Sequence, residues 1–389
     1  MKYQNAKDYL NEELLLELQK QAGGRLLYVP TIGEKKNWGE VSGERTKLRE
    51  RNRQICREHA NGYNVRELAD KWYLSVASIR KILAADKVNP RNHYLGLDIG
   101  GTFIKYGVVD EDGHVLLFDS VETPNDLDGF LNTLYHVIDL VREKDPHICG
   151  VGVGCAGLIE NGNVVTASNL PFKATPLRDL LAAHAGLPVL LENDANCAAL
   201  GEYNPSKDVN MLYLTLGTGV GAGVILNHQL YRGSRGVAGE AGHITLVLDG
   251  KPCPCGKRGC FEQYASATAL VRYTEEAIKK HPDSLMATMA KEAPVDGRLS
   301  FNAAKEGCPV AQSVIDTFCH YLAAGIDSLC EVLDPQHVVL AGGITKEGEG
   351  LLEPLRRQLR TSVLVTVAQN RGQSGVLGAA RLFSPSGGR

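Results

Sequence analysis

The sequence has 389 residues, enough for two or three domains of about 150 residues each. Hydrophobic residues make up 43% and charged residues 22%, which excludes a wholly disordered chain. No apolar run reaches the roughly 18 to 20 residues of a membrane-spanning helix, and the first residues lack the apolar core of a secretory signal. We therefore expect a cytoplasmic protein with no membrane partner.

The net charge of −3 is unevenly distributed along the chain. Residues 1–92 carry 18 Lys and Arg against 12 Asp and Glu, whereas residues 93–389 carry 24 against 33. A basic segment joined to an acidic one is typical of a nucleic-acid-binding head on another domain, although chance surface charge can produce the same difference. We call residues 1–92 the head and residues 93–389 the body.

Amphipathic helices are predicted along the head. Leucines four residues apart predict a helix over Lys7–Gln21, and six basic residues crowd the segment Glu44–His59. The segment Asn64–Leu83 then shows two short helical patterns on either side of a turn, with Ser75 placed to cap the second. Two helices in this spacing, with the small residue Ala69 where they cross, predict an all-α helix-turn-helix domain.

A helix-turn-helix indicates binding to double-stranded DNA, because its second helix fits the major groove and nearby arginines can contact phosphates. The alternative is a helical packing or dimerisation module. The Asn89–Pro90 pair breaks a helix and predicts a linker over Lys87–Asn92. The candidate DNA-binding residues are Arg49, Arg53, Ser78, Arg80 and Lys81.

The body shows the same order of predicted elements twice. The first set comprises a hairpin over Tyr94–Asp110, a strand Val115–Val121, a helix Leu127–Lys144, a strand Ile148–Cys155, a helix Leu177–Ala185 and a strand Val189–Glu192. The second set comprises a hairpin from Met211–Gly217 to Ala222–Asn227, one long helical stretch from Ala265 into the 320s, and a strand Val338–Leu340. This repetition predicts a duplicated α/β fold with lobes over residues 93–205 and 206–389, and ligands bind where such halves meet.

Three glycine-rich corners follow predicted strands: Asp98–Thr102, Gly217–Gly221 and Ala341–Ile344. Glycine lets backbone N–H groups approach an anion closely, and Asp98 could hold a hydrated Mg²⁺ beside phosphates. For any one corner the alternative is a structural hairpin turn. The spacing fits neither a P-loop nor the dinucleotide-binding fingerprint.

The segment Glu192–Asn196 directly follows a strand. Asp194 is a candidate general base, since a carboxylate at a strand end can accept a proton in a cleft, and Asn193 could orient a substrate. The alternative is an Asx turn that caps the next helix, Ala195–Tyr203.

One His and three Cys within an 18-residue span predict a tetrahedral Zn²⁺ site. Four protein ligands close the coordination shell, so the metal would be structural; unrelated buried thiols are the alternative. A fixed loop would also aim Glu240 and Glu262 into the cleft, where sugar hydroxyls need carboxylate acceptors, whereas each alone could be surface charge. The candidate ligands are His243, Cys253, Cys255 and Cys260.

With these motifs, residues 94–383 resemble the ROK family (repressor, open reading frame, kinase) of the actin-like ATPase superfamily. The corners resemble its phosphate and adenosine motifs, Gly239–Glu262 resembles its sugar and zinc signature, and Ser168–Pro171 resembles its sugar-contacting loop. The resemblance implies a two-lobed, duplicated ribonuclease H-like α/β fold. It also implies an ATP-dependent, glucokinase-like hexose kinase acting at the 6-hydroxyl, with ATP, Mg²⁺ and structural Zn²⁺. Because the family includes repressors, the alternative is a sugar-responsive transcriptional regulator.

The resemblance also implies a role for each motif residue, and a homodimer or homotetramer. Asp194 would be the catalytic base. The sugar-binding residues would be Asn169, Asn193, Asp194, Glu240, His243 and Glu262. The nucleotide-binding residues would be Asp98, Gly100, Gly101, Thr102, Lys105, Gly217, Thr218, Gly219, Gly342 and Gly343.

Overall fold

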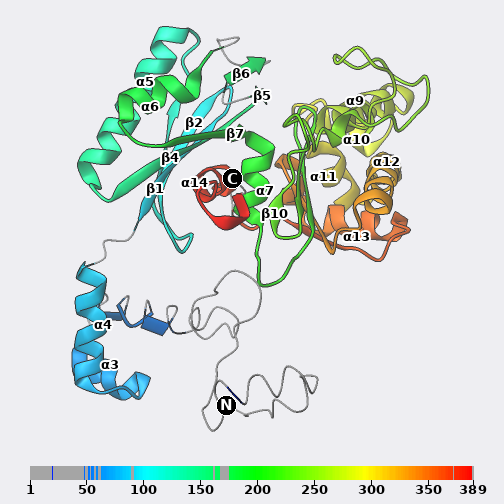
Figure 1. The fold of residues 1–389 in the computed structure, drawn as a ribbon. Coiled ribbons are helices and arrows are strands. Elements are labelled where there is room, and N and C mark those ends of the chain that lie inside the picture. The colour runs from blue at the N-terminus through cyan, green and yellow to red at the C-terminus, as the bar shows by residue number, and fades with distance from the viewer. Residues whose placement is uncertain are drawn as a thin grey trace. The chain divides into compact units, whose positions relative to one another are not determined.

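The computed structural model in Figure 1 divides the chain into two compact units, Met1–Asn89 and Pro90–Arg389. It describes residues 20, 48, 51–52, 54–56, 58–59, 63–88, 92–160, 163–166, 175–370 and 372–387. The predicted helix Lys7–Gln21 falls outside this set except for Lys20, as do Arg49 and Arg53. Within the described residues, no helix is long and apolar enough to cross a membrane.

The first unit contains a pair of short helices, α3 (Val65–Trp72) and α4 (Val76–Val88). Asn64 caps α3: its Oδ1 accepts from the Glu67 backbone N–H at 3.1 Å, and the Glu67 carboxylate accepts from the Asn64 N–H at 2.8 Å. Tyr73 ends α3 in the left-handed region, with φ of 52°. Ser75 Oγ then accepts from the Ser78 N–H at 3.0 Å, which starts α4 at the predicted residue.

The described part of this unit has a small core of its own. Glu58, which precedes α3 in the chain, is hydrogen-bonded to the end of that helix: its carboxylate accepts from Trp72 Nε1 at 2.9 Å and from Lys71 Nζ at 3.0 Å. Arg80 and Lys81 are exposed on α4. The fully or nearly buried apolar residues are Ile55, Leu68, Ala69 and Ile79.

The second unit begins with a five-stranded sheet in the order β3-β2-β1-β4-β7. Its strands are β1 (His93–Ile99), β2 (Phe103–Asp110), β3 (Val115–Glu122), β4 (Ile148–Cys155) and β7 (Val189–Asn193). The first three are antiparallel, and β4 and β7 run parallel to β1. Helices α5 (Leu127–Lys144) and α6 (Leu177–Ala185) have the predicted bounds, and a small hairpin pairs β5 (Leu158–Glu160) with β6 (Asn163–Thr166).

A second five-stranded sheet repeats this arrangement in the order β10-β9-β8-β11-β12. Its strands are β8 (Met211–Leu216), β9 (Val220–Leu226), β10 (Gln229–Leu230), β11 (His337–Ala341) and β12 (Leu364–Val367). Here too the first three strands are antiparallel and the last two run parallel to β8. The predicted duplication and two-lobed actin-like α/β fold are therefore confirmed.

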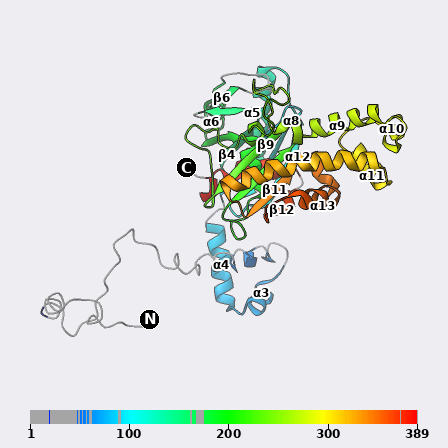
Figure 2. The same cartoon turned by 90° about the vertical axis from the view of Figure 1, so that its right-hand side faces the viewer.

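The helical stretch predicted from Ala265 into the 320s is confirmed, and it is divided into several helices. Five helices cover this region: α8 (Glu262–Ala265), α9 (Ala267–Lys280), α10 (Leu285–Met289), α11 (Leu299–Lys305) and α12 (Pro309–Leu333). Pro282, Pro294 and Pro309 remove backbone donors at the breaks, and Gly307 turns the chain with φ of 83°. Figure 2 shows α12 running along this lobe, beside α9 and α13 (Glu349–Gln358).

Two helices lie between the sheets, α7 (Asp194–Glu202) and α14 (Ser374–Arg381) (Figure 1). Helix α7 follows β7 of the first sheet but packs on β8 and β9, and α14 follows β12 of the second sheet but packs on β1 and β4. Strand glycines permit this approach, because a Cβ on Gly152 would collide with the Ala379 carbonyl and one on Gly223 with Ala199. Each half of the duplicated fold therefore places a helix on the sheet of the other half.

Candidate active site

A first cavity of about 840 Å³ lies among the ends of β1, β8, β11 and the two central helices. Two of the three predicted glycine corners meet here. Of the residues predicted to bind nucleotide, Asp98, Gly100, Lys105, Gly342 and Gly343 line it. Gly101 and Thr102 are exposed and do not line this cavity.

A second cavity of about 480 Å³ contains most of the residues predicted to bind sugar. The remaining glycine corner also opens here rather than into the first cavity. The predicted residues lining it are Asn193, Asp194, Gly217, Thr218, Gly219, Glu240, His243 and Glu262. Asn169 lies outside the described residues. Asp194, Ala195 and Thr215 line both cavities, so a group transferred between the two would pass this point.

Asp98 lies near the end of β1 with its carboxylate against the backbone of Gly375, the second residue of α14. Any side chain at Gly375 would collide with that carboxylate. Lys105 Nζ lies 3.6 Å from Asp98 Oδ2. Burial raises the pKa of Asp98, while Lys105 opposes the shift. A desolvated carboxylate beside a single ammonium group suits a site that a hydrated Mg²⁺ would share.

Asp194 is the first residue of α7. Burial raises the pKa of its carboxyl, and a hydrogen bond from the Ala195 N–H to Oδ1 at 3.0 Å opposes the shift. A carboxylate with a raised pKa is a stronger base, as proton abstraction requires.

Asn193 caps the same helix, as the Asx-turn alternative predicts. Its Oδ1 accepts from the Ala195 and Asn196 N–H groups at 2.9 and 3.2 Å, and its Nδ2 donates to the Gly157 carbonyl at 3.3 Å. Both polar atoms of the Asn193 side chain are thus in use within the protein. A sugar contact by Asn193 would use the second N–H of Nδ2, since both lone pairs of Oδ1 are taken.

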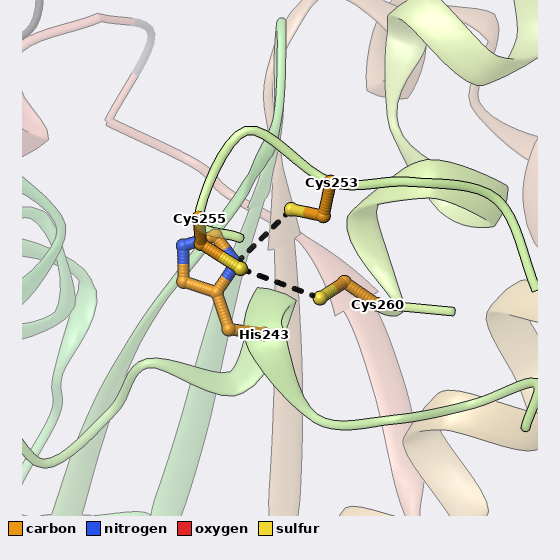
Figure 3. Close-up of side chains that lie close together, drawn as sticks. All are labelled: His243, Cys253, Cys255 and Cys260. Atoms are coloured by element: carbon orange, nitrogen blue, oxygen red, sulfur yellow. Dashed lines mark hydrogen bonds between the residues drawn. The ribbon is translucent and has the colours of Figure 1, made fainter. Parts of the chain in front are cut away.

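The His and Cys side chains converge on one point (Figure 3). Their ligand atoms all lie within 4.8 Å of one another. Cys255 Sγ lies 3.6 Å from Cys260 Sγ, and His243 Nδ1 lies 3.8 Å from Cys253 Sγ. A tetrahedral Zn²⁺ with Zn–S bonds of about 2.3 Å separates its sulfur ligands by about 3.8 Å. The four residues therefore fit such an ion.

The cluster is joined to the second cavity through His243 and Glu262. His243 Nδ1 faces Cys253, while Nε2 lies 3.9 Å from Glu240 Oε2 on the cavity side. Glu262 Oε1 accepts from Cys253 Sγ at 3.0 Å. Gly219 leaves room for Glu262, since a Cβ there would collide with Oε2. A metal bound at this cluster would deprotonate Cys253 and so remove its bond to Glu262. It would fix the second cavity through His243 itself and through the backbone at Cys260, two residues before Glu262.

Three residues with a place in this site were not predicted from the sequence. Thr215 of β8 lines both cavities. Glu192 accepts from Arg232 Nε at 2.5 Å, and Glu202 accepts from Ser374 Oγ at 2.6 Å. A signal for Glu192 exists in the sequence, namely an acidic residue continuing a buried strand.

Comparisons with known proteins find similar sugar kinases and sugar-related repressors. A glucokinase from Streptomyces coelicolor is 36% identical over 306 residues, which cover 74% of this chain and 96% of that protein. A xylose repressor from Caldicellulosiruptor bescii is 31% identical over 273 residues, covering 67% of this chain and 68% of the repressor. Kinases and repressors are thus both among the similar proteins.

A comparison with solved structures also finds a similar kinase. The crystal structure of a ROK family glucokinase from Streptomyces griseus in complex with glucose and AMPPNP superposes with a TM-score of 0.65. It is 36% identical to this chain and covers 75% of it, and 99% of that glucokinase is matched. The ROK family model matches residues 94–385. The chain therefore belongs to the ROK family.

Proposed function

We propose that the chain is an ATP-dependent sugar kinase that transfers the γ-phosphoryl group of ATP to the 6-hydroxyl of a hexose. One observation carries the proposal: Asp194, a half-buried carboxyl with a raised pKa, lines both cavities. The first cavity would hold ATP and the second the sugar. The complex of the similar Streptomyces griseus glucokinase with glucose and AMPPNP supports this pair of ligands.

In this proposal Asp194 accepts the proton of the attacking hydroxyl as the oxygen bonds to the γ-phosphorus and ADP leaves. Such transfer depends mainly on positioning and on stabilising the charge of the phosphoryl oxygens. Backbone N–H groups at Gly342 and Gly343 would supply neutral donors in the first cavity, and Lys105 would supply a positive charge. The Gly100 N–H is already used, since it donates to the Phe103 carbonyl at 3.0 Å. Mg²⁺ held at Asp98 would neutralise phosphate charge.

The sugar would be held by carboxylates in the second cavity. Glu240 and Glu262 can each accept hydrogen bonds from adjacent hydroxyls, and His243 lies between them, 3.9 Å and 3.7 Å away. Zinc bound by His243, Cys253, Cys255 and Cys260 would keep this arrangement rigid and would take no part in the chemistry, since four protein ligands leave no open position.

The kinase proposal is tested by measuring ADP release with glucose, mannose, allose and N-acetylhexosamines, each with Mg·ATP. We expect turnover with at least one of these sugars and formation of a 6-phosphate by NMR. Binding of a sugar without turnover of any of them would contradict it.

A sugar-responsive regulator is the second candidate function. The capped pair α3 and α4, with Arg80 and Lys81 exposed, supports a DNA-binding head over residues 1–92, and the similar xylose repressor supports the class. Ser78 fits this role less simply, since its hydroxyl lies 2.9 Å from Ser75 Oγ in the cap. Both functions can coexist in one chain.

The regulator proposal is tested on the full chain with DNA from its own promoter region. We expect a salt-dependent mobility shift that the Arg80→Ala/Lys81→Ala double variant loses, while the exposed-residue control Lys144→Ala keeps it. Unchanged binding by the double variant would contradict placement of α4 in the groove.

A further inference from the structure

We infer that the two carboxylates flanking Asp194 are positioning residues that divide the site between them. Glu192, two residues before Asp194, holds the wall of the second cavity. Glu202, at the far end of α7, holds the wall of the first. This inference rests on the proposed function, in which the second cavity binds sugar and the first binds ATP.

Glu192 is 6% exposed at the end of β7 and uses both carboxylate oxygens. Oε1 accepts from the Asn193 N–H and from Asn196 Nδ2, both at 2.9 Å. Oε2 accepts from Arg232 Nε at 2.5 Å. The pair joins a strand of the first sheet to the loop that follows β10 in the second sheet.

Arg232 begins the loop that forms one wall of the second cavity. Its carbonyl accepts from the Ala238 N–H at 3.1 Å, which closes the loop on itself. Three glycines in this loop have positive φ, so an unanchored loop would gain much freedom: Gly233, Gly236 and Gly239. The loop contributes Gly236, Ala238, Gly239 and Glu240 to the cavity. The Glu192–Arg232 ion pair therefore anchors the segment that carries a proposed sugar ligand.

Glu202 anchors a different segment, the connection between β12 and α14. Oε2 accepts from the Gln369 N–H at 2.9 Å, while Oε1 accepts from the Asn370 N–H at 3.0 Å and from Ser374 Oγ at 2.6 Å. Asn370 Nδ2 returns a bond to the Gly201 carbonyl at 2.9 Å. This connection contributes Ala368 and Gly372 to the first cavity, and the start of α14 contributes Ser374 and Gly375.

Helix α7 joins the two anchors. It has nine residues and is therefore about 14 Å long. Asp194 stands at its start beside Glu192, and Glu202 stands at its end. Glu192 therefore fixes the wall of the second cavity relative to Asp194, and Glu202 fixes the wall of the first cavity relative to the same residue. Neither Glu192 nor Glu202 lines a cavity described above, so neither needs to touch a ligand.

The test is a crossed binding experiment on the full chain. Glucose, or the preferred sugar of the panel, is titrated without nucleotide, and AMPPNP with Mg²⁺ is titrated without sugar. We expect Glu192→Gln to weaken sugar binding about tenfold or more with AMPPNP binding unchanged, and Glu202→Gln to do the reverse. In steady-state kinetics, Glu192→Gln should raise the KM for sugar and Glu202→Gln should raise the KM for ATP.

Glu331→Gln on the exposed side of α12 is the matched control and should keep both affinities. Wild-type affinities in both folded variants, or equal weakening of both ligands by each variant, would overturn the inference. If a Gln variant does not fold, Arg232→Lys takes the sugar arm and Asn370→Ala, which removes the bond to Gly201, takes the nucleotide arm. A wild-type chain that binds neither ligand would instead overturn the proposed function.

Discussion

The two halves of the body share one topology but differ in charge where they face the cleft. Asp98 of β1 pairs with Lys105 and Gly154, and at the equivalent place in β8, Thr215 pairs with Gly221 and Ala341.

The crossing helices differ in the same way, since α7 begins with Asp194 and α14 with Ser374. The first half thus supplies carboxylates where the second supplies hydroxyls. The two halves share their topology, but only the first half has a carboxylate at the start of its crossing helix. The body therefore has one proposed acid–base centre, at Asp194, and not two.

The largest effect is expected from removing the charge at the start of α7. Asp194→Asn should lower kcat by about 10³-fold, in the range typical of general-base residues. Its counterpart Ser374→Ala should lower kcat by less than about tenfold, because only one hydrogen bond is lost. Coupled measurement of ADP release checks both. Equal losses in the two variants would break the comparison between the halves.

A smaller effect is expected at the paired strand positions. Asp98→Asn should lower kcat/KM by about 10²-fold, as loss of a charge-stabilising group does, whereas Thr215→Val should cost about tenfold. The Mg²⁺ concentration that gives half-maximal rate should rise for Asp98→Asn alone. A stronger effect at Thr215 would mean that the second half carries the charge-stabilising group.

The His–Cys cluster belongs to the second half, and its His243 lines the second cavity but not the first. Cys255→Ser should lose zinc, measured by elemental analysis, and weaken sugar binding by about tenfold or more. AMPPNP binding should not change. Cys149→Ser, which removes a half-buried thiol in the first half, should keep the metal and both affinities. Unchanged sugar affinity in metal-free Cys255→Ser would contradict the orienting role.

The smallest effect concerns stability against pH. Because burial raises the pKa of Asp194, the folded state holds this proton more tightly than the unfolded state, so the group lowers stability as pH rises through its pKa values. Asp194→Asn should therefore have a higher Tm than wild type at pH 8, and the difference should shrink as pH is lowered. The exposed Asp283→Asn serves as the control. A lower Tm for Asp194→Asn at pH 8 would contradict this account.

The elements predictable from the sequence are those with local signals at both ends. Helix α5 begins after Asp126, whose carboxylate accepts from the Gly129 N–H at 2.7 Å, and α6 ends at Ala185, before Gly186 with φ of 62°. Both bounds were predicted. Helix α14 was not, because its glycines lower helix propensity and its place is set by close packing, as at Gly378 against the Cys197 carbonyl.

The candidate site divides in the same way. Asp98, Asp194 and the His–Cys cluster stand in compact motifs, so their positions could be predicted, although their roles stay proposals. Glu192 and Glu202 could not be found this way, because the partners are 40 residues away for Glu192–Arg232 and 172 for Glu202–Ser374. Contacts over such separations depend on the finished topology.

The crossing of α7 and α14 has a consequence for how the chain can be divided. Each half packs one of its helices on the sheet of the other half, so the two halves exchange helices within a single polypeptide. A fragment ending in the turn after Tyr203 would retain α7 but lack α14, so the close-packed glycines of β1 and β4 would be uncovered. The remaining fragment would lack α7, the helix that covers β9. We therefore expect the two pieces to complete their cores only when they recombine, which makes the two halves alike in topology but dependent on each other for folding.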